Sequence, residues 1–298
     1  MQPPRAERAI DGRHTMEPSG LLARLEAYRD LRFRRLKTRR VTGEQSALGF
    51  INQSGFCTAF TAGLGVPCLR EAIAGERAPA LPEHIQHDYA IGKTWELKDR
   101  LPAKRLVYYG KVIGGRPGFI ALELLPAFLR LRVAPGGYRS LYARGQLSRC
   151  AMLVMETLSR RGAAETRALK LSSGFARPRE RAEFDRAMNE LQEKFLALKV
   201  EERYDPFTYV WDTLEHRWAG ALRTARSLSS SEAAYRIVRR YFEVAGFGSE
   251  RAVARLMAID PALVAGAARR LERERVIARG LRIDGVAGAH GVLTGLLA

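Results

Sequence analysis

The stretch that decides the fold is FLALKVEERYDPFTYVWDT, residues 195–213. It predicts two strands, 195–202 and 207–213, on either side of Arg203-Tyr204-Asp205-Pro206. Apolar residues at helical spacing predict three helices before these strands. The expected helices cover residues 148–161, 164–171 and 180–195. Three helices followed by a two-stranded wing are typical of a winged helix-turn-helix module.

The C-terminal part of the chain repeats this order. Ser229, with Glu232 three residues later, forms a capping box that opens a helix to Ala245. Further helices are expected over 249–258 and 261–275, and wing strands over 276–283 and 291–297. A third module is expected where the helices between Leu21 and Ile73 combine with a hairpin over 105–125, whose turn is predicted at Gly114-Gly115.

The sequence therefore predicts an α+β, mainly helical fold of tandem winged helix-turn-helix modules. The expected parts are a disordered tail (1–17), an N-terminal winged-helix-like module with a β-hairpin (18–130), a second winged helix (146–218) and a third (229–298). Residues 130–146, which include Pro135-Gly136-Gly137, are the expected linker.

The charge balance points to a polyanionic partner. Among 298 residues, 50 Lys and Arg stand against 32 Asp and Glu, for a net charge of +18. Basic residues are dense between Arg29 and Arg40. Nucleic acid is the first candidate partner and an anionic membrane surface the second. No apolar run approaches the length of a membrane span, so we expect no membrane partner.

The sequence offers no set of residues with metal-ligand spacing. Cys57, Cys68 and Cys150 are not spaced as ligands, and His84 and His87 lack further ligands nearby. We therefore expect no metal and no cofactor. An odd number of cysteines without an export signal predicts reduced thiols and a cytoplasmic, nucleoid-associated protein.

The second distinctive stretch is ALGFINQSGFCTAF, residues 47–60, where three polar residues interrupt an apolar run. In an extended chain, Asn52 and Ser54 would point to one face and Gln53 to the other. One interpretation is a buried strand or turn in which these residues satisfy backbone groups. The other is a functional site.

A winged-helix protein without catalytic activity is the principal alternative. A transcriptional regulator would place the third helix of a module in the major groove, with basic or amide side chains toward the bases. The helix at 180–195 is rich in acids and suits this role poorly. The C-terminal helix, with Arg269 and Arg270, suits it better.

The chain resembles the AlkZ/YcaQ-like winged-helix DNA glycosylases. The resemblance lies in Arg39-Arg40, in the run Leu48-Gly49-Phe50-Ile51-Asn52-Gln53-Ser54 and in the order of modules over residues 20–298. It implies tandem winged helices around a basic DNA-binding channel and hydrolysis of the N-glycosidic bond of alkylated or crosslinked bases. The family signature is Gln-x-Gln or Gln-x-Asp after a Leu-Gly-aliphatic run. Here Asn52 and Ser54 would form that pair.

The resemblance also implies roles for further residues. Base excision passes through a sugar with oxocarbenium character, so a water must be held near the anomeric carbon. Asn52 would orient that water with help from Ser54 and Gln53. Asp88, Asp99 or Glu123 would supply a carboxylate. The alternative for Glu123 is a solvent-facing or lysine-paired position in its strand. Trp95, Tyr108 and Tyr109 would stack on an extruded base or fill its gap, the alternative being a place in the core. The expected DNA contacts are Arg34, Arg35, Arg39, Arg40, Lys98, Lys111, Arg269 and Arg270.

The function predicted from these residues is that of a monofunctional DNA glycosylase. Its partner would be double-stranded DNA with a modified base, and it would act as a monomer. The altered signature favours a bulky base: a crosslinked or alkylated purine, or a hypermodified phage pyrimidine such as glucosylated 5-hydroxymethylcytosine. The first substrate implies DNA repair and the second antiviral defence. A Schiff base on Lys98 or Lys111 is the alternative mechanism.

Overall fold

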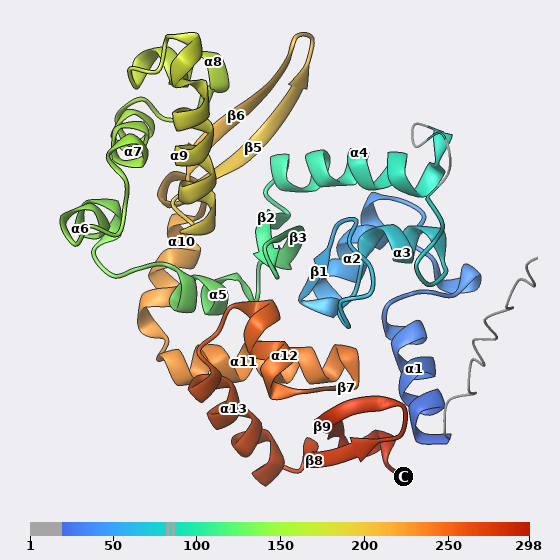
Figure 1. Cartoon of the computed structure of the whole chain (residues 1–298). Helices are drawn as coiled ribbons and strands as arrows, with labels where there is room; N and C mark the ends of the chain where they lie inside the picture. Colours follow the sequence, from blue (N-terminus) through green and yellow to red (C-terminus); the bar gives the residue numbers. More distant parts are fainter. Residues whose placement is uncertain (1–19, 82–83, 85–86) are drawn as a thin grey trace, which may run out of the picture.

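The computed structural model describes residues 20–81, 84 and 87–298, so the expected tail at 1–17 lies outside the described residues. The chain is mainly helical, with small antiparallel sheets (Figure 1), as expected. The chain starts with α1 (Gly20–Arg32) and the short η1 (Lys37–Arg39). Three units with the same order of elements follow, and short helices connect them.

The bounds of the elements define the units. Unit 1 comprises α2 (Glu44–Ser54), β1 (Phe56–Thr58), α3 (Leu69–Ala74), α4 (Tyr89–Ala103), β2 (Val107–Ile113) and β3 (Arg116–Ala121). After α5 (Leu125–Arg132) and α6 (Gly137–Ala143), unit 2 comprises α7 (Arg149–Arg161), β4 (Ala164–Glu165), α8 (Thr166–Ser172), η3 (Pro178–Glu180), α9 (Arg181–Glu193), β5 (Ala197–Tyr204) and β6 (Phe207–Thr213). After α10 (Leu214–Ser227), unit 3 comprises α11 (Ser230–Ala245), β7 (Phe247–Gly248), α12 (Glu250–Met257), α13 (Pro261–Arg273), β8 (Ile277–Ile283) and β9 (Val286–Leu293), and η4 (Thr294–Leu296) follows it.

The units repeat each other in backbone detail. The first helix of each ends at a glycine in the positive-φ region, Gly55, Gly162 or Gly246, where a residue with a Cβ would be strained. The last helix of each ends through a residue with φ of 56–57°, namely Arg105, Phe195 or Arg275. In each sheet the short strand pairs with the second hairpin strand, giving the orders β1-β3-β2, β4-β6-β5 and β7-β9-β8.

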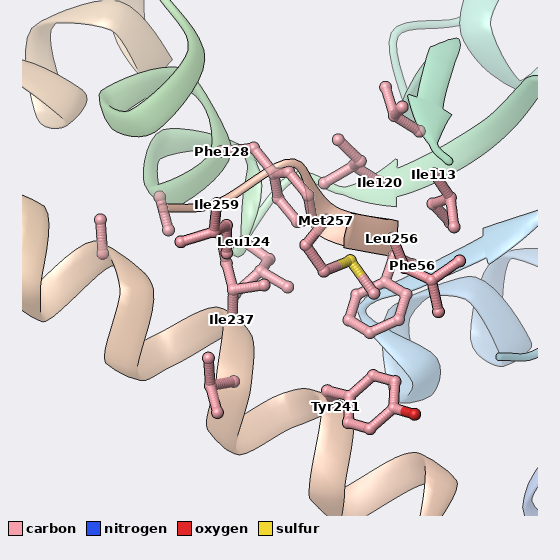
Figure 2. Close-up of a cluster of buried hydrophobic side chains, with 14 of the residues drawn as sticks. Phe56, Ile113, Ile120, Leu124, Phe128, Ile237, Tyr241, Leu256, Met257 and Ile259 are labelled. Carbon is pink, nitrogen blue, oxygen red and sulfur yellow. The ribbon is translucent and has the colours of Figure 1, made fainter. Parts of the chain in front are cut away.

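Units 1 and 3 share one hydrophobic core, which fixes their relative position. Figure 2 shows Phe56 and Ile120 of the first sheet beside Tyr241 of α11 and Met257 of α12, all almost fully buried. The backbone N–H of Gly114, at the hairpin turn, donates to the carbonyl of Leu256 at 2.7 Å. α5 packs against both α10 and α11. The end of α2 is therefore held rigidly beside α11.

Several expected boundaries are wrong. Residues 47–54 are helical, because Ala47, Phe50, Ile51 and Ser54 follow a helical period and are all buried. Residues 130–146 form the end of α5 and all of α6, so they are not an extended linker. β9 begins five residues before the expected position, at Val286. β3 ends at Ala121, so Glu123 lies in the turn after it.

None of the helices in the described ranges is long and apolar enough to cross a membrane.

Candidate active site at the end of α2

The last turn of α2 is fixed by an arginine from unit 3. Nη1 of Arg240, in α11, donates to the carbonyl oxygens of Asn52 at 3.2 Å and Gln53 at 3.4 Å. These carbonyls have no partner within the helix, and a cation there also complements the helix dipole. The next residue, Gly55, lies so close to Arg240 that an added Cβ would be 2.7 Å from its Cγ. Gly55 is thus required both by its φ of 78° and by this contact.

A pocket of about 380 Å³ opens beside this turn. Its polar lining consists of Gln53 and Ser54 from α2 and of three arginines near the end of α1; Leu31 and Val244 complete the wall. The arginines are Arg32, Arg34 and Arg39. Ser54 is only 2% exposed, whereas Gln53 is exposed. The pocket thus joins α1, α2 and α11, three elements from distant parts of the sequence.

Arg34 holds the side chain of Gln53 in one orientation. Its Nη2 donates to Oε1 of Gln53 at 3.1 Å, and its Nη1 donates to the carbonyl of Ser46 at 3.2 Å. A guanidinium can only donate, so the Gln53 oxygen must face Arg34 and the Gln53 NH₂ group is left to other partners. The amide of Gln53 therefore presents donors to the pocket.

The backbone of Arg34 adopts a conformation that usually requires glycine. Its φ is 56°, and its backbone N–H donates to the Leu31 carbonyl at 3.3 Å. The backbone N–H of Arg35 donates to the backbone carbonyl of Asp30 at 2.8 Å. This is the Schellman end of a helix, with arginine at the left-handed position. Such a residue costs about 1–2 kcal/mol relative to a right-handed one. The strain occurs where the Arg34 side chain reaches both the pocket and Gln53.

The positive charge of the pocket has no counterion within the described residues. Arg32, Arg34 and Arg39 form no salt bridge there, and no carboxylate lines the pocket. Burial, together with the charge of Arg39, lowers the pKa of Arg34. The guanidinium stays protonated at neutral pH because its ordinary pKa is so high. An anionic or electron-rich ligand would relieve this repulsion.

Of the three polar residues expected to act, Asn52 is the one that does not line the pocket. Asn52 is exposed, and its backbone carbonyl accepts from Arg240. Because the stretch is helical and not extended, Gln53 and Ser54 share the pocket, whereas the expected grouping was Asn52 with Ser54. The resemblance assigns the pair Asn52–Ser54, but the geometry places Gln53–Ser54 together.

The three candidate carboxylates have different positions, and one of them, Asp99, is paired with Lys98. Asp88 is the N-cap of α4, and its Oδ1 accepts from the N–H of Ile91 at 2.6 Å, which gives it a structural role. Glu123 is 79% exposed, and its Oε1 lies 3.7 Å from Nη2 of Arg240, the same arginine that binds the end of α2. Glu123 is thus the candidate carboxylate that the structure brings to this site.

Lys98 has a structural environment instead of the expected phosphate contact. Its side chain is 3% exposed, pairs with Asp99 and lies 2.9 Å from Oε1 of Glu202 in β5, which is itself 5% exposed. Lys199 reaches the same oxygen at 3.1 Å. Burial opposes ionisation of Glu202, but its hydrogen bonds and charge interactions with the two lysines lower its pKa. This buried network, Lys98–Asp99–Glu202–Lys199, fastens α4 to the unit 2 hairpin.

The other expected DNA contacts also divide into free and paired groups. Arg35 is paired with the buried Glu71 at 2.8 Å and is 7% exposed, so it is structural. Arg270 is paired with Glu232 and Glu274 and lies over the Tyr235 ring. Nζ of Lys111 donates to Asn189 at 3.2 Å. Arg40 and Arg269 are exposed.

The three aromatic candidates lie in different environments. Tyr108 is 3% exposed and stacks on Phe195 at 5.5 Å, so it belongs to the core and cannot reach a base. Tyr109 packs against Phe119. Trp95 is 48% exposed beside Phe60 and is the one of the three that presents a large exposed surface.

Most of the chain matches one known protein family. Residues 41–258 match the family described as "AlkZ related". The chain belongs to this family. The match includes all of α2 and the whole of units 1 and 2, and it ends after α12 of unit 3.

A solved structure has the same fold. It is the Streptomyces sahachiroi DNA glycosylase AlkZ, with a TM-score of 0.58 and 14% sequence identity; the match covers 95% of this chain and 73% of that chain. No curated protein matches the sequence. The AlkZ likeness establishes the fold that carries the pocket.

Sequence reasoning missed four residues of the site, namely Leu31, Arg32, Arg240 and Val244. Arg32 belongs to the basic run between Arg29 and Arg40, so its charge was a usable signal. Arg240 and Val244 come from α11, almost two hundred residues after α2, and local sequence patterns give no indication of that contact. No group of three or more His, Cys, Asp or Glu side chains in the described ranges could hold a metal ion.

Proposed function

We propose that this AlkZ-related protein is a DNA glycosylase. It would hydrolyse the N-glycosidic bond of a bulky or modified base in double-stranded DNA and leave an abasic site. The observation that carries the proposal is the donor-lined pocket at the end of α2, where Arg34 fixes Gln53 beside Ser54. The net charge of +18 and the DNA glycosylase activity named for AlkZ support the choice of DNA as substrate.

The three units would act as winged helices on the duplex. Their proposed extents are 44–121, 149–213 and 230–293, each with its hairpin as the wing. The free cations near the pocket, including Arg39 and Arg40, would neutralise phosphates on either side of the extruded nucleotide. We keep the expectation that one chain acts alone, near the nucleoid in the cytoplasm.

The catalytic roles follow from what each group can do. The NH₂ group of Gln53 and the hydroxyl of Ser54 would donate hydrogen bonds to the departing base. Glu123, on the other side of Arg240, would accept the proton of the attacking water. Asn52, exposed on the same turn, would bind the sugar or that water. Trp95 would contact the unstacked region of the duplex.

The proposed reaction is monofunctional hydrolysis. No lysine lines the pocket in the part of the chain that the structure describes, and Lys98 is committed to buried ion pairs. A Schiff base therefore has no evident nucleophile at this site. The product would be an intact abasic site that breaks only in alkali, and borohydride would trap no adduct.

The test is the release of free base from defined duplexes. Each duplex carries one modified base, either an alkylated or crosslinked purine or a hypermodified pyrimidine such as glucosylated 5-hydroxymethylcytosine. Mass spectrometry detects the base, and alkaline cleavage locates the abasic site. Release of the purine would indicate a role in repair, and release of the phage pyrimidine a role in antiviral defence. If the full-length protein binds these duplexes but releases no base from any of them, the alternative of a non-catalytic regulator replaces this proposal.

A further inference from the structure

The pocket at the end of α2 carries a second inference, on the chemical class of the base. The hydrogen-bonding groups on its wall are almost all donors. Arg32, Arg34 and Arg39 have no acceptor, and the acceptor oxygen of Gln53 is already used by Arg34. Only the hydroxyl of Ser54 can both donate and accept. A ligand in this pocket must therefore bring the acceptors.

The positive charge of the pocket also favours a ligand that is rich in acceptors. Three guanidinium groups line it without a salt bridge to any described carboxylate. The two carboxylates that lie against Arg240 are already paired with it, Glu243 at 3.5 Å and the 79% exposed Glu123 at 3.7 Å, and neither lines the pocket. A cationic ligand would thus meet repulsion in a partly desolvated space, whereas an electron-rich one would be attracted.

These properties distinguish two kinds of leaving base. When the C1′–N bond breaks, its electron pair stays on the base nitrogen, and the oxygen of water bonds to C1′. An uncharged base leaves as an anion until it receives a proton, here the one that the water gives up. An N7-alkylated purine carries a positive charge before cleavage and leaves uncharged, so donors around it stabilise no developing charge. Preorganised donors accelerate the first reaction and not the second.

We propose that the pocket accepts an uncharged, acceptor-rich base and stabilises the negative charge that develops on it, in preference to a cationic N-alkylated purine. This inference rests on the proposed glycosylase function and narrows its substrate. A volume of about 380 Å³ lies within the usual range for ligand pockets, roughly 300–1,000 Å³, and leaves room for a substituent on the base.

A DNA phosphate is the other acceptor-rich group that the three arginines would attract. The hydrogen bond from Arg34 to Gln53 favours the base, because a phosphate site formed by arginines has no need of an oriented glutamine.

The experiment compares four duplexes of one sequence under single-turnover conditions. The target is 7-methylguanine as the cationic base, or uracil, 5-hydroxymethylcytosine or its glucosylated form as the uncharged bases. Each rate of release is divided by the spontaneous rate in the same buffer, which corrects for the lability of 7-methylguanine. We expect the acceleration for at least one uncharged base to exceed that for 7-methylguanine by about 100-fold or more, the value of one oxyanion donor.

Variants then assign the effect to the pocket. Arg34→Gln should lower release of the uncharged base by about 10²–10³-fold and leave the small acceleration of 7-methylguanine within about threefold. Arg34→Lys keeps the positive charge but lacks the paired N–H donors of a guanidinium. Its rate of release should lie between those of the parent and of Arg34→Gln. The matched control is Arg223→Gln, an exposed arginine of α10 that lies outside the three units and has no salt bridge in the described ranges, which should change neither rate. Circular dichroism and thermal unfolding verify that each variant is folded.

The outcomes separate this inference from the proposed function. Preferential acceleration of 7-methylguanine would overturn the inference and leave the glycosylase standing. An Arg34→Gln variant that binds all duplexes more weakly but releases each base at the parental rate would make the site a phosphate contact, which also overturns it. Absence of release from all four duplexes would overturn the inference, and the duplex with a crosslinked purine in the preceding test would then decide the glycosylase function.

Discussion

Two polar regions of this molecule use similar side chains for opposite purposes. The buried network of Lys98, Asp99, Glu202 and Lys199 pairs each cation with a carboxylate and joins α4 to the unit 2 hairpin. The pocket at the end of α2 collects three arginines without a carboxylate. Charges that balance within the chain serve the fold, whereas charges left without partners are available to a ligand. In the sequence, Lys98 and Lys199 lie close to Asp99, Glu201 and Glu202, whereas the basic run from Arg29 to Arg40 contains one acid, Asp30. Only the fold shows which of these charges pair.

The largest expected effect concerns Gln53. Gln53→Ala removes the oriented donor and should lower the rate of base release by about 10²–10⁴-fold, the usual contribution of a positioned polar catalytic group. DNA binding should be nearly unchanged, because an uncharged side chain contributes little to phosphate neutralisation. The measurements are single-turnover release and binding by fluorescence anisotropy.

Asn52→Ala is the matched control for Gln53→Ala. Asn52 is on the same turn and is also an exposed amide, but it does not line the pocket. Its loss should reduce the rate by less than the loss of Gln53. If Asn52→Ala is the more damaging of the two, the catalytic pair is Asn52–Ser54, as the family signature implies, and the pocket is not the active site.

The next effect concerns stability, and it tests the paired region. Lys98→Met removes the ammonium group between Asp99 and Glu202, whereas Lys199 still pairs with Glu202. The loss should therefore be smaller than the about 3–5 kcal/mol for a buried charge left without any partner. Urea unfolding should show this loss in the free energy of unfolding. Release of base per folded molecule should stay at the parental level in mild conditions. A folded Lys98→Met protein without activity would instead give Lys98 a catalytic role.

Salt dependence should separate the free arginines from the paired one. If the protein neutralises about six phosphates, the logarithm of the DNA binding constant should fall with the logarithm of salt concentration with a slope of roughly −5. Replacing the exposed Arg40 and Arg269 by glutamine should flatten this slope by about 0.9 for each phosphate that is no longer neutralised. Arg35→Gln should reduce stability and leave the slope unchanged, because Arg35 is paired with Glu71. A slope near zero for the parent protein would exclude phosphate binding.

Much of the fold could be predicted from local signals, and the site only in part. Ser229 caps α11 as expected, and the Gly114-Gly115 turn joins β2 and β3. These features depend on residues close in sequence. The helical state of Asn52-Gln53-Ser54 was missed because three polar residues obscured the helical period of their buried neighbours. The partnership with Arg240 depends on how units 1 and 3 pack, and no short stretch of sequence encodes it.

The smallest expected effect is a pH dependence of the paired region. The pKa of Glu202 is lowered in the folded protein, so its ionised form stabilises the fold at pH values above the ordinary glutamate pKa of about 4.3. This contribution is lost as the pH falls through the lowered pKa, because the unfolded chain binds a proton first. Glu202→Gln cannot ionise, so its stability deficit relative to the parent should be greatest near neutral pH and should shrink as the pH falls below about 4. Urea unfolding between pH 7 and pH 3 measures this difference, with Glu193→Gln as the control, since Glu193 is exposed at the end of α9 and forms no salt bridge in the described residues. A deficit for Glu202→Gln that stays constant over this range would mean that Glu202 stabilises the fold through packing alone. The ion pairs of the Lys98–Glu202 network would then not be the reason for its stability.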